Sequence, residues 1–124
     1  MSVGRIIETD ADVAEGAAWL AARDSRLENA LAETGPLPLR RRPDGFAELL
    51  SAIVSQQVST ASARALWSRL QDAGVTDTAT VQAHSEEALR ALGLSRQKAR
   101  YARALADAEI DFPALRSAPD QEVI

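Results

Sequence analysis

The sequence contains no cysteine and only one histidine, His84. The absence of cysteine excludes a disulfide scaffold, an iron–sulfur cluster, a zinc site built on thiolates and a cysteine nucleophile. A single histidine also excludes metal sites with several histidine ligands and any mechanism that needs two histidines. We therefore expect neither a metal ion nor a cofactor in this chain.

Long apolar runs are absent as well, so no segment is long enough to span a membrane. The N-terminal residues lack the apolar core of a signal peptide, and we expect a cytoplasmic protein with no membrane partner. The 124 residues are 46% hydrophobic, which corresponds to one folded domain or less rather than to a disordered chain.

The formal net charge is −4, which argues against non-specific binding to nucleic acid. The basic residues are nevertheless grouped. Residues 36–71 hold five basic and two acidic side chains, and residues 95–106 hold four basic and no acidic ones. These blocks are either two solvated helix faces or a local basic face that can hold phosphate.

Every periodic segment predicts a helix, and no alternating run predicts a strand, so we expect an all-α fold. Apolar stripes predict helices at about 10–33, 44–58, 60–73, 86–92 and 96–108. The last three are expected to be capped by Ser59 or Thr60, by Ser85 and by Ser95. Pro119 opens one more helix, which stops at Ile124 and indicates a truncated reading frame. The large side chains that we expect in or beside the core include Trp19, Trp67 and Tyr101.

Two segments carry a resemblance to a known family. One is the turn Ser55-Gln56-Gln57-Val58-Ser59, and the other is Gly93-Leu94-Ser95-Arg96-Gln97-Lys98-Ala99-Arg100-Tyr101. Together they resemble the helix-hairpin-helix DNA glycosylases, in the branch of 3-methyladenine DNA glycosylase II. The resemblance covers residues 37–124 and implies an incomplete all-α helical bundle. It places residues 1–36 in a second lobe and residues 37–124 in the first helices of a six-helix barrel lobe, truncated before the hairpin.

The resemblance implies base excision repair. A monofunctional glycosylase of this branch hydrolyses the N-glycosidic bond of alkylated purines in double-stranded DNA with damaged bases. The complete protein is then expected to be a monomer that acts on the bacterial nucleoid. The family's Gly-Ile-Gly hairpin and its catalytic aspartate have no match before Ile124. We therefore assign no catalytic residue here and expect the 124-residue chain alone to be inactive.

Gln57, with Gln56 beside it, matches the family's wedge, the side chain that fills the space left by a flipped nucleotide. Flipping costs a few kcal/mol of unstacking and unpairing, and a wedge offsets part of that cost. An amide suits this role because it packs in the base stack and also hydrogen-bonds the orphaned base. The alternative for Gln57 is a plain helix cap.

Further residues are candidates for contacts with the DNA backbone. The candidates are the hydroxyl side chains around the turn and the arginines of the proline-rich connector: Ser55, Ser59, Thr60, Arg40, Arg41 and Arg42. Capping is the favoured explanation for the three hydroxyls, and an exposed connector explains the arginines as well as a contact with DNA does. Lys98 is expected to be either structural or phosphate-facing.

Two other functions stay open. In the first, the protein is not an enzyme, and residues 59–106 form a helix-turn-helix-like module that binds DNA. The arginines Arg96, Arg100 and Arg103 then face a groove of the DNA. In the second, the chain is a folding remnant whose exposed apolar surface leads it to aggregate or dimerise.

Overall fold

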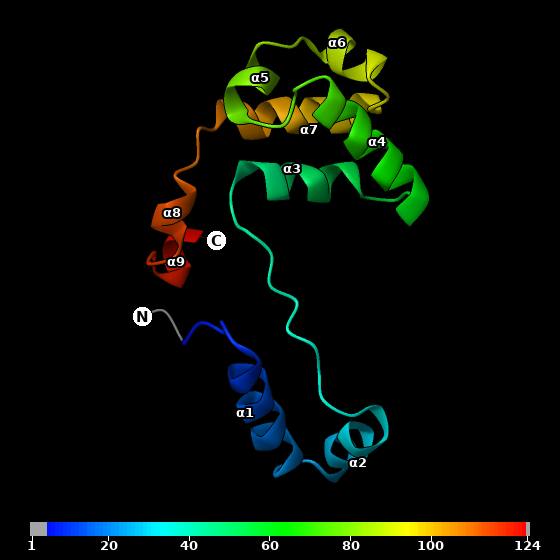
Figure 1. The fold of residues 1–124 in the computed structure, drawn as a ribbon. Coiled ribbons are helices and arrows are strands. Elements are labelled where there is room, and N and C mark those ends of the chain that lie inside the picture. Colours follow the sequence, from blue (N-terminus) through cyan, green and yellow to red (C-terminus); the bar gives the residue numbers. More distant parts are fainter. Residues whose placement is uncertain (1–4, 124) are drawn as a thin grey trace. The chain divides into compact units, whose positions relative to one another are not determined.

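The computed structural model describes residues 5–123, and all regular elements within that range are helices (Figure 1). The all-α prediction is confirmed. The helices are α1 Asp10–Ala21, α2 Ser25–Thr34, α3 Phe46–Val54, α4 Thr60–Asp72, α5 Thr78–Gln82, α6 Glu86–Ala91, α7 Arg96–Asp107, α8 Phe112–Leu115 and α9 Asp120–Val123. Ile124, where the predicted last helix stops, lies outside the described residues, as do the first four residues of the predicted N-terminal lobe.

The contacts divide the chain into two compact units, residues 1–42 and residues 43–124. The first unit contains α1 and α2, and the second contains α3 to α9. The assignment of 1–36 and 37–124 to two lobes stays a prediction. No helix within residues 5–123 is long and apolar enough to cross a membrane.

The prediction of one continuous helix over residues 10–33 is wrong, because the chain breaks between α1 and α2. Asp24 adopts an extended backbone, with φ −140° and ψ 114°, and its carboxylate accepts a hydrogen bond from the Arg26 amide at 2.9 Å. Aspartate is a favoured N-cap, so it competes with helix continuation at this position. The Arg26 guanidinium, and then the same amide, lower the pKa of Asp24.

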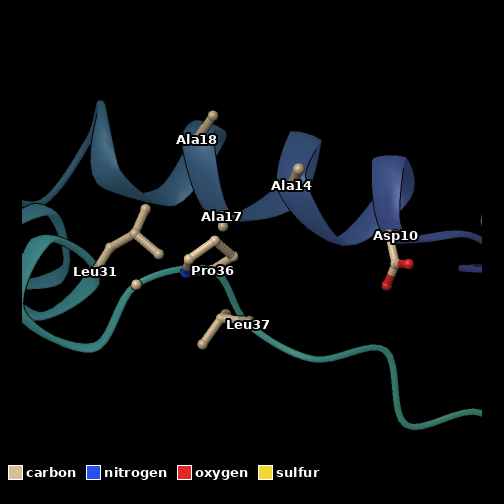
Figure 2. Close-up of a pocket in the computed structure, with 8 residues that line it drawn as sticks. Asp10, Ala14, Ala17, Ala18, Leu31, Pro36 and Leu37 are labelled. Atoms are coloured by element: carbon tan, nitrogen blue, oxygen red, sulfur yellow. The ribbon is translucent and has the colours of Figure 1, made fainter.

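The first unit has an apolar face but no buried core in its described part, residues 5–42. No residue of α1 or α2 is buried, and Trp19, which we expected beside the core, is 55% exposed. The Arg23 guanidinium lies 3.6 Å from the centre of the Trp19 ring, in cation–π geometry. An open apolar hollow of about 490 Å³ lies beside α1 and is lined on its other side by Leu31, Pro36 and Leu37, which Figure 2 labels.

Helix α3 is shorter than its apolar stripe. It starts at Phe46 rather than Asp44 and ends at Val54, so the last apolar position of the stripe, Val58, lies outside the helix and is exposed. Leu50 and Val54 are buried, at 1% and 0% exposure. Only part of the apolar stripe is therefore buried in the core, and the residues after Val54 form a surface turn.

The core of the second unit is built around α7, which packs against α3, α5 and α6 (Figure 1). Its buried positions are the alanines Ala99, Ala102 and Ala106, whose small side chains allow neighbouring helices to approach closely. They pack with larger aliphatic residues on the surrounding elements: Leu50, Val54, Leu70, Val75, Val81, Leu89 and Leu94. Tyr101 was predicted to be buried with them but is 43% exposed, so that prediction is wrong.

The predicted serine caps are confirmed at Ser59, Ser85 and Ser95, each of which accepts a hydrogen bond from the amide three residues ahead. The short helices α5 and α8 were not predicted from the sequence. Helix α5 begins with a capping box between Asp77 and Thr80, and the Thr80 amide lowers the pKa of Asp77. That pairing was the available signal, because five residues are too few to show a periodic stripe.

One ion pair connects the two ends of the second unit. The Arg116 guanidinium, after α8, donates to both carboxylate oxygens of Asp44, before α3, at 2.6 and 2.8 Å. Both side chains are more than half exposed, so the pair is screened by solvent. We expect Arg116→Ala to lower the free energy of unfolding by less than about 1 kcal/mol. Urea unfolding at low and at high salt checks this: a loss above about 2 kcal/mol, or one that salt leaves unchanged, would contradict it.

Candidate functional site

The turn that follows α3 carries the two glutamines singled out from the sequence. Gln57 has a φ of 57°, in the left-handed region that residues other than glycine, asparagine and aspartate rarely occupy. This conformation costs on the order of 1 kcal/mol. Strained positions of this kind are frequent at functional sites, where the surrounding structure holds them in place.

The side-chain amide of Gln57 is exposed and has no hydrogen-bond partner among residues 5–123. The helix end is capped without it: the Ser55 amide donates to the Ser51 carbonyl at 3.0 Å, and the Gln56 amide donates to the Ile53 carbonyl at 3.2 Å. The Gln57 side chain therefore makes no capping hydrogen bond, whereas its left-handed backbone is a conformation that commonly ends a helix. The side-chain amide of Gln57 is free on an exposed turn, and its role as a wedge stays a prediction.

Both sequence motifs meet at one surface hollow of about 240 Å³ in the second unit. One wall is the turn, with Gln56, Gln57 and Val58. The other wall is the first part of α7, with Ser95, Gln97, Lys98 and Tyr101. Two segments that lie far apart in the sequence thus form a single site, which neither motif showed by itself.

Lys98 is half-buried in this hollow, and its ammonium donates a hydrogen bond of 2.7 Å to the Val54 carbonyl, the last carbonyl of α3. A helix C-terminus presents unpaired carbonyls at its negative end, so a cation is stabilised there. Of the two expectations for Lys98, the structure supports the structural one.

Gln97 and Tyr101 are the members of the site that the sequence analysis missed. The Gln97 amide donates to the Tyr101 hydroxyl at 2.7 Å across one turn of α7. Their i, i+4 spacing was a readable signal for such a pair. Tyr101 was instead assigned to the core because it lies on the apolar stripe of this helix, with Ala102 and Ala106.

The predicted contacts of hydroxyl groups with DNA have local explanations. The Ser55 hydroxyl donates to the Ser51 carbonyl at 2.8 Å. The Ser59 hydroxyl caps α4 by accepting from the Ser62 amide at 3.1 Å, and Thr60 is the exposed first residue of α4. Contacts of these three residues with phosphate stay predictions.

The arginines of the connector belong to the first unit, whereas the turn with Gln57 belongs to the second. Arg40, Arg41 and Arg42 are all exposed, and the Arg41 guanidinium lies 3.7 Å from a carboxylate oxygen of Glu8. Their predicted contacts with the DNA backbone also stay predictions.

The second basic block lies on α7. Arg96 and Arg100 are exposed and Arg103 is half-buried, on a face next to the one that carries Gln97 and Tyr101. Within residues 5–123, no group of three or more histidine, cysteine, aspartate or glutamate side chains could hold a metal ion. His84 is half-buried, with Nδ1 placed 2.7 Å from the Thr80 carbonyl, which gives it a local structural role.

Comparisons with known proteins identify similar proteins. The family model of the HhH-GPD superfamily base excision DNA repair proteins matches residues 50–123, a range that contains both walls of the hollow. A solved structure of a DNA-3-methyladenine glycosidase from Bacillus halodurans aligns over 94% of this chain with 30% sequence identity and a TM-score of 0.71. No curated protein matches the chain.

The chain spans about half, 54%, of the chain of that Bacillus halodurans structure. The resemblance that the two motifs predicted is confirmed by both findings. With a family match over more than half of its residues and a matching fold, this chain belongs to the HhH-GPD superfamily of base excision DNA repair proteins.

Proposed function

We propose that this chain supplies the nucleotide-flipping side of a DNA glycosylase that hydrolyses the N-glycosidic bond of alkylated purines in double-stranded DNA. The observation that carries the proposal is the free amide of Gln57, held at a positive φ on the rim of the hollow that joins both family motifs. The Bacillus halodurans relative is a DNA-3-methyladenine glycosidase, and its activity on an alkylated purine supports the substrate class.

The chemistry divides into two tasks. An alkylated purine that carries a positive charge is already a good leaving group, so the enzyme mainly has to expose it and stabilise the sugar cation that develops. Exposure requires unstacking, which costs a few kcal/mol and costs least where a base is damaged or missing. The turn with Gln56 and Gln57 serves this first task, with Gln57 as the wedge. The second task requires a carboxylate near the sugar, and no residue of this chain is assigned to it.

The proposal predicts a preference for damaged DNA. The chain should bind a duplex with a tetrahydrofuran abasic-site analogue about tenfold more tightly than the same duplex intact, which corresponds to about 1.4 kcal/mol. Fluorescence anisotropy at fixed salt measures both affinities, because affinity for DNA depends steeply on salt. Equal affinity for the two duplexes would contradict the wedge and favour the helix-turn-helix-like alternative that uses Arg96, Arg100 and Arg103.

A further inference from the structure

We propose that Lys98 is the positioning residue of the wedge turn: through the Val54 carbonyl it fixes the direction in which the chain leaves α3 and thereby presents Gln57. This inference rests on the proposed function for its effect on DNA. Its structural part, the control of the turn by Lys98, stands on the geometry alone.

The contact between Lys98 and Val54 joins residues that are distant in the sequence. The Lys98 ammonium lies 2.7 Å from the Val54 carbonyl oxygen, although the two residues are 44 positions apart. Hydrogen bonds with a charged donor are shorter and stronger than neutral ones. No carboxylate among residues 5–123 pairs with Lys98, so this carbonyl is the contact that its ammonium makes.

The carbonyl of Val54 controls the start of the turn because a peptide unit is planar. The Val54 carbonyl and the Ser55 amide belong to the same plane, so holding both ends fixes its orientation. Lys98 holds the carbonyl, and the bond from the Ser55 amide to the Ser51 carbonyl holds the other end. Packing of the Val54 side chain, which is 0% exposed, anchors the helix but places no restraint of its own on the Val54 carbonyl oxygen.

The turn has few other restraints. Gln56, Gln57 and Val58 are all exposed, and Gln57 keeps an unfavourable positive φ. Among the described residues outside α3 and the turn, Lys98 is the one whose side chain hydrogen-bonds to residues 53–58. Without that bond we expect the last turn of α3 to fray and Gln57 to leave its strained conformation, since frayed segments open at low free-energy cost.

The first test measures the stability of the turn in the absence of DNA. Lys98→Met keeps an apolar stem of similar length and removes the donor. In this variant, we expect the Ser55 and Gln56 amides to exchange with solvent at least about fivefold faster, as measured by NMR hydrogen exchange. The amide of the buried Ala106 on the same helix should exchange at an unchanged rate and so reports that the fold is intact. Unchanged exchange at both Ser55 and Gln56 would overturn the proposal.

The second test measures the effect of the turn on DNA binding. We expect Lys98→Met to lower the abasic-over-intact affinity ratio about fivefold, while the dependence of affinity on salt stays as in the unaltered chain. In a Gln57→Ala background, Lys98→Met should change the ratio no further, because it acts through Gln57. The proposal would be overturned if the two substitutions acted independently, so that the double variant lowered the ratio by the product of the two single effects. It would also be overturned if Lys98→Met made the affinity less dependent on salt, because that indicates a direct contact with phosphate.

Arg100→Met is the matched control, since it removes one positive charge from an exposed position of the same helix. It should change the affinity for both duplexes by the same factor and leave the Ser55 and Gln56 amides unaffected. Lys98→Gln, whose side chain is one atom shorter and carries no charge, repeats both tests if the methionine variant does not fold. If the unaltered chain shows no preference for the abasic duplex, the proposed function fails, and the exchange experiment still decides the role of Lys98.

Discussion

Replacing Gln57 by alanine is expected to lower the affinity of this chain for a duplex with an abasic-site analogue about tenfold, with less than a threefold change for the intact duplex. The amide of Gln57 has no partner within the described part of the chain, so it is available to fill a vacated position in the base stack. Loss of that filling group removes the energy that offsets unstacking, and tenfold corresponds to about 1.4 kcal/mol.

The substitution isolates the side chain from the backbone. Alanine keeps the Cβ atom, so the cost of the positive φ at position 57 is the same before and after the change. The free energy of unfolding should therefore stay within about 0.5 kcal/mol, as is usual for exposed positions. Anisotropy titrations of both duplexes, combined with urea unfolding, check the two expectations together.

Gln71→Ala is the control for this experiment, because Gln71 is also exposed and lies at the end of α4, outside the residues that line the hollow. It should leave both affinities unchanged. The wedge assignment would have to be abandoned if Gln57→Ala weakened binding to the two duplexes equally. It would also fail if Gln71→Ala reproduced the loss.

Replacing Gly93 by alanine is expected to lower the free energy of unfolding by about 2 to 4 kcal/mol. Gly93 has a φ of 115°, which residues with a side chain rarely adopt, and a Cβ atom there would lie 2.7 Å from Leu66 Cδ2 and 2.7 Å from an Arg69 Nη. The Arg69 end can move away, but Leu66 packs against the core and must shift. For a unit of this size the loss corresponds to a fall in Tm of roughly 10 to 20 °C.

Gly74→Ala separates the cost of the positive φ from the cost of the close contact with Leu66. Gly74 also has a positive φ, 72°, but apart from its chain neighbours no atom of the described residues lies within 4 Å of the place that its Cβ would take. It should cost about 1 kcal/mol, the backbone cost alone. Thermal and urea unfolding followed by circular dichroism measure both variants. Equal losses at positions 74 and 93 would show that the approach of Leu66 has no energetic weight.

Helices with a full apolar stripe and a serine cap could be predicted from the sequence, and short or interrupted ones could not. Ser59, Ser85 and Ser95 marked the starts of α4, α6 and α7 correctly. The break at Asp24 was missed because the apolar stripe continues through it, while the deciding interaction is a local bond from a side chain to the backbone. Stripe periodicity contains no information about such a bond.

The candidate site could be predicted in part. The turn with Gln57 was located from the motif, and its neighbour Gly93-to-Tyr101 was recognised as a second motif, but their meeting at one hollow was not foreseen. The contact of Lys98 with Val54 depends on how α7 packs against α3. That packing depends on the buried alanines of α7. The sequence shows them only as small residues and does not indicate which helix packs against them.

The left-handed backbone at Gln57 limits how this position can change over generations. Glycine occupies that conformation at the lowest cost, so selection for heat resistance alone would favour a residue with no side chain there. Under the proposed wedge role of Gln57, selection for repair of DNA favours a long amide at the same place. Gains in heat resistance and gains in nucleotide flipping therefore oppose each other at one codon, and a heat-adapted descendant that still repairs DNA must find its added stability elsewhere in the chain.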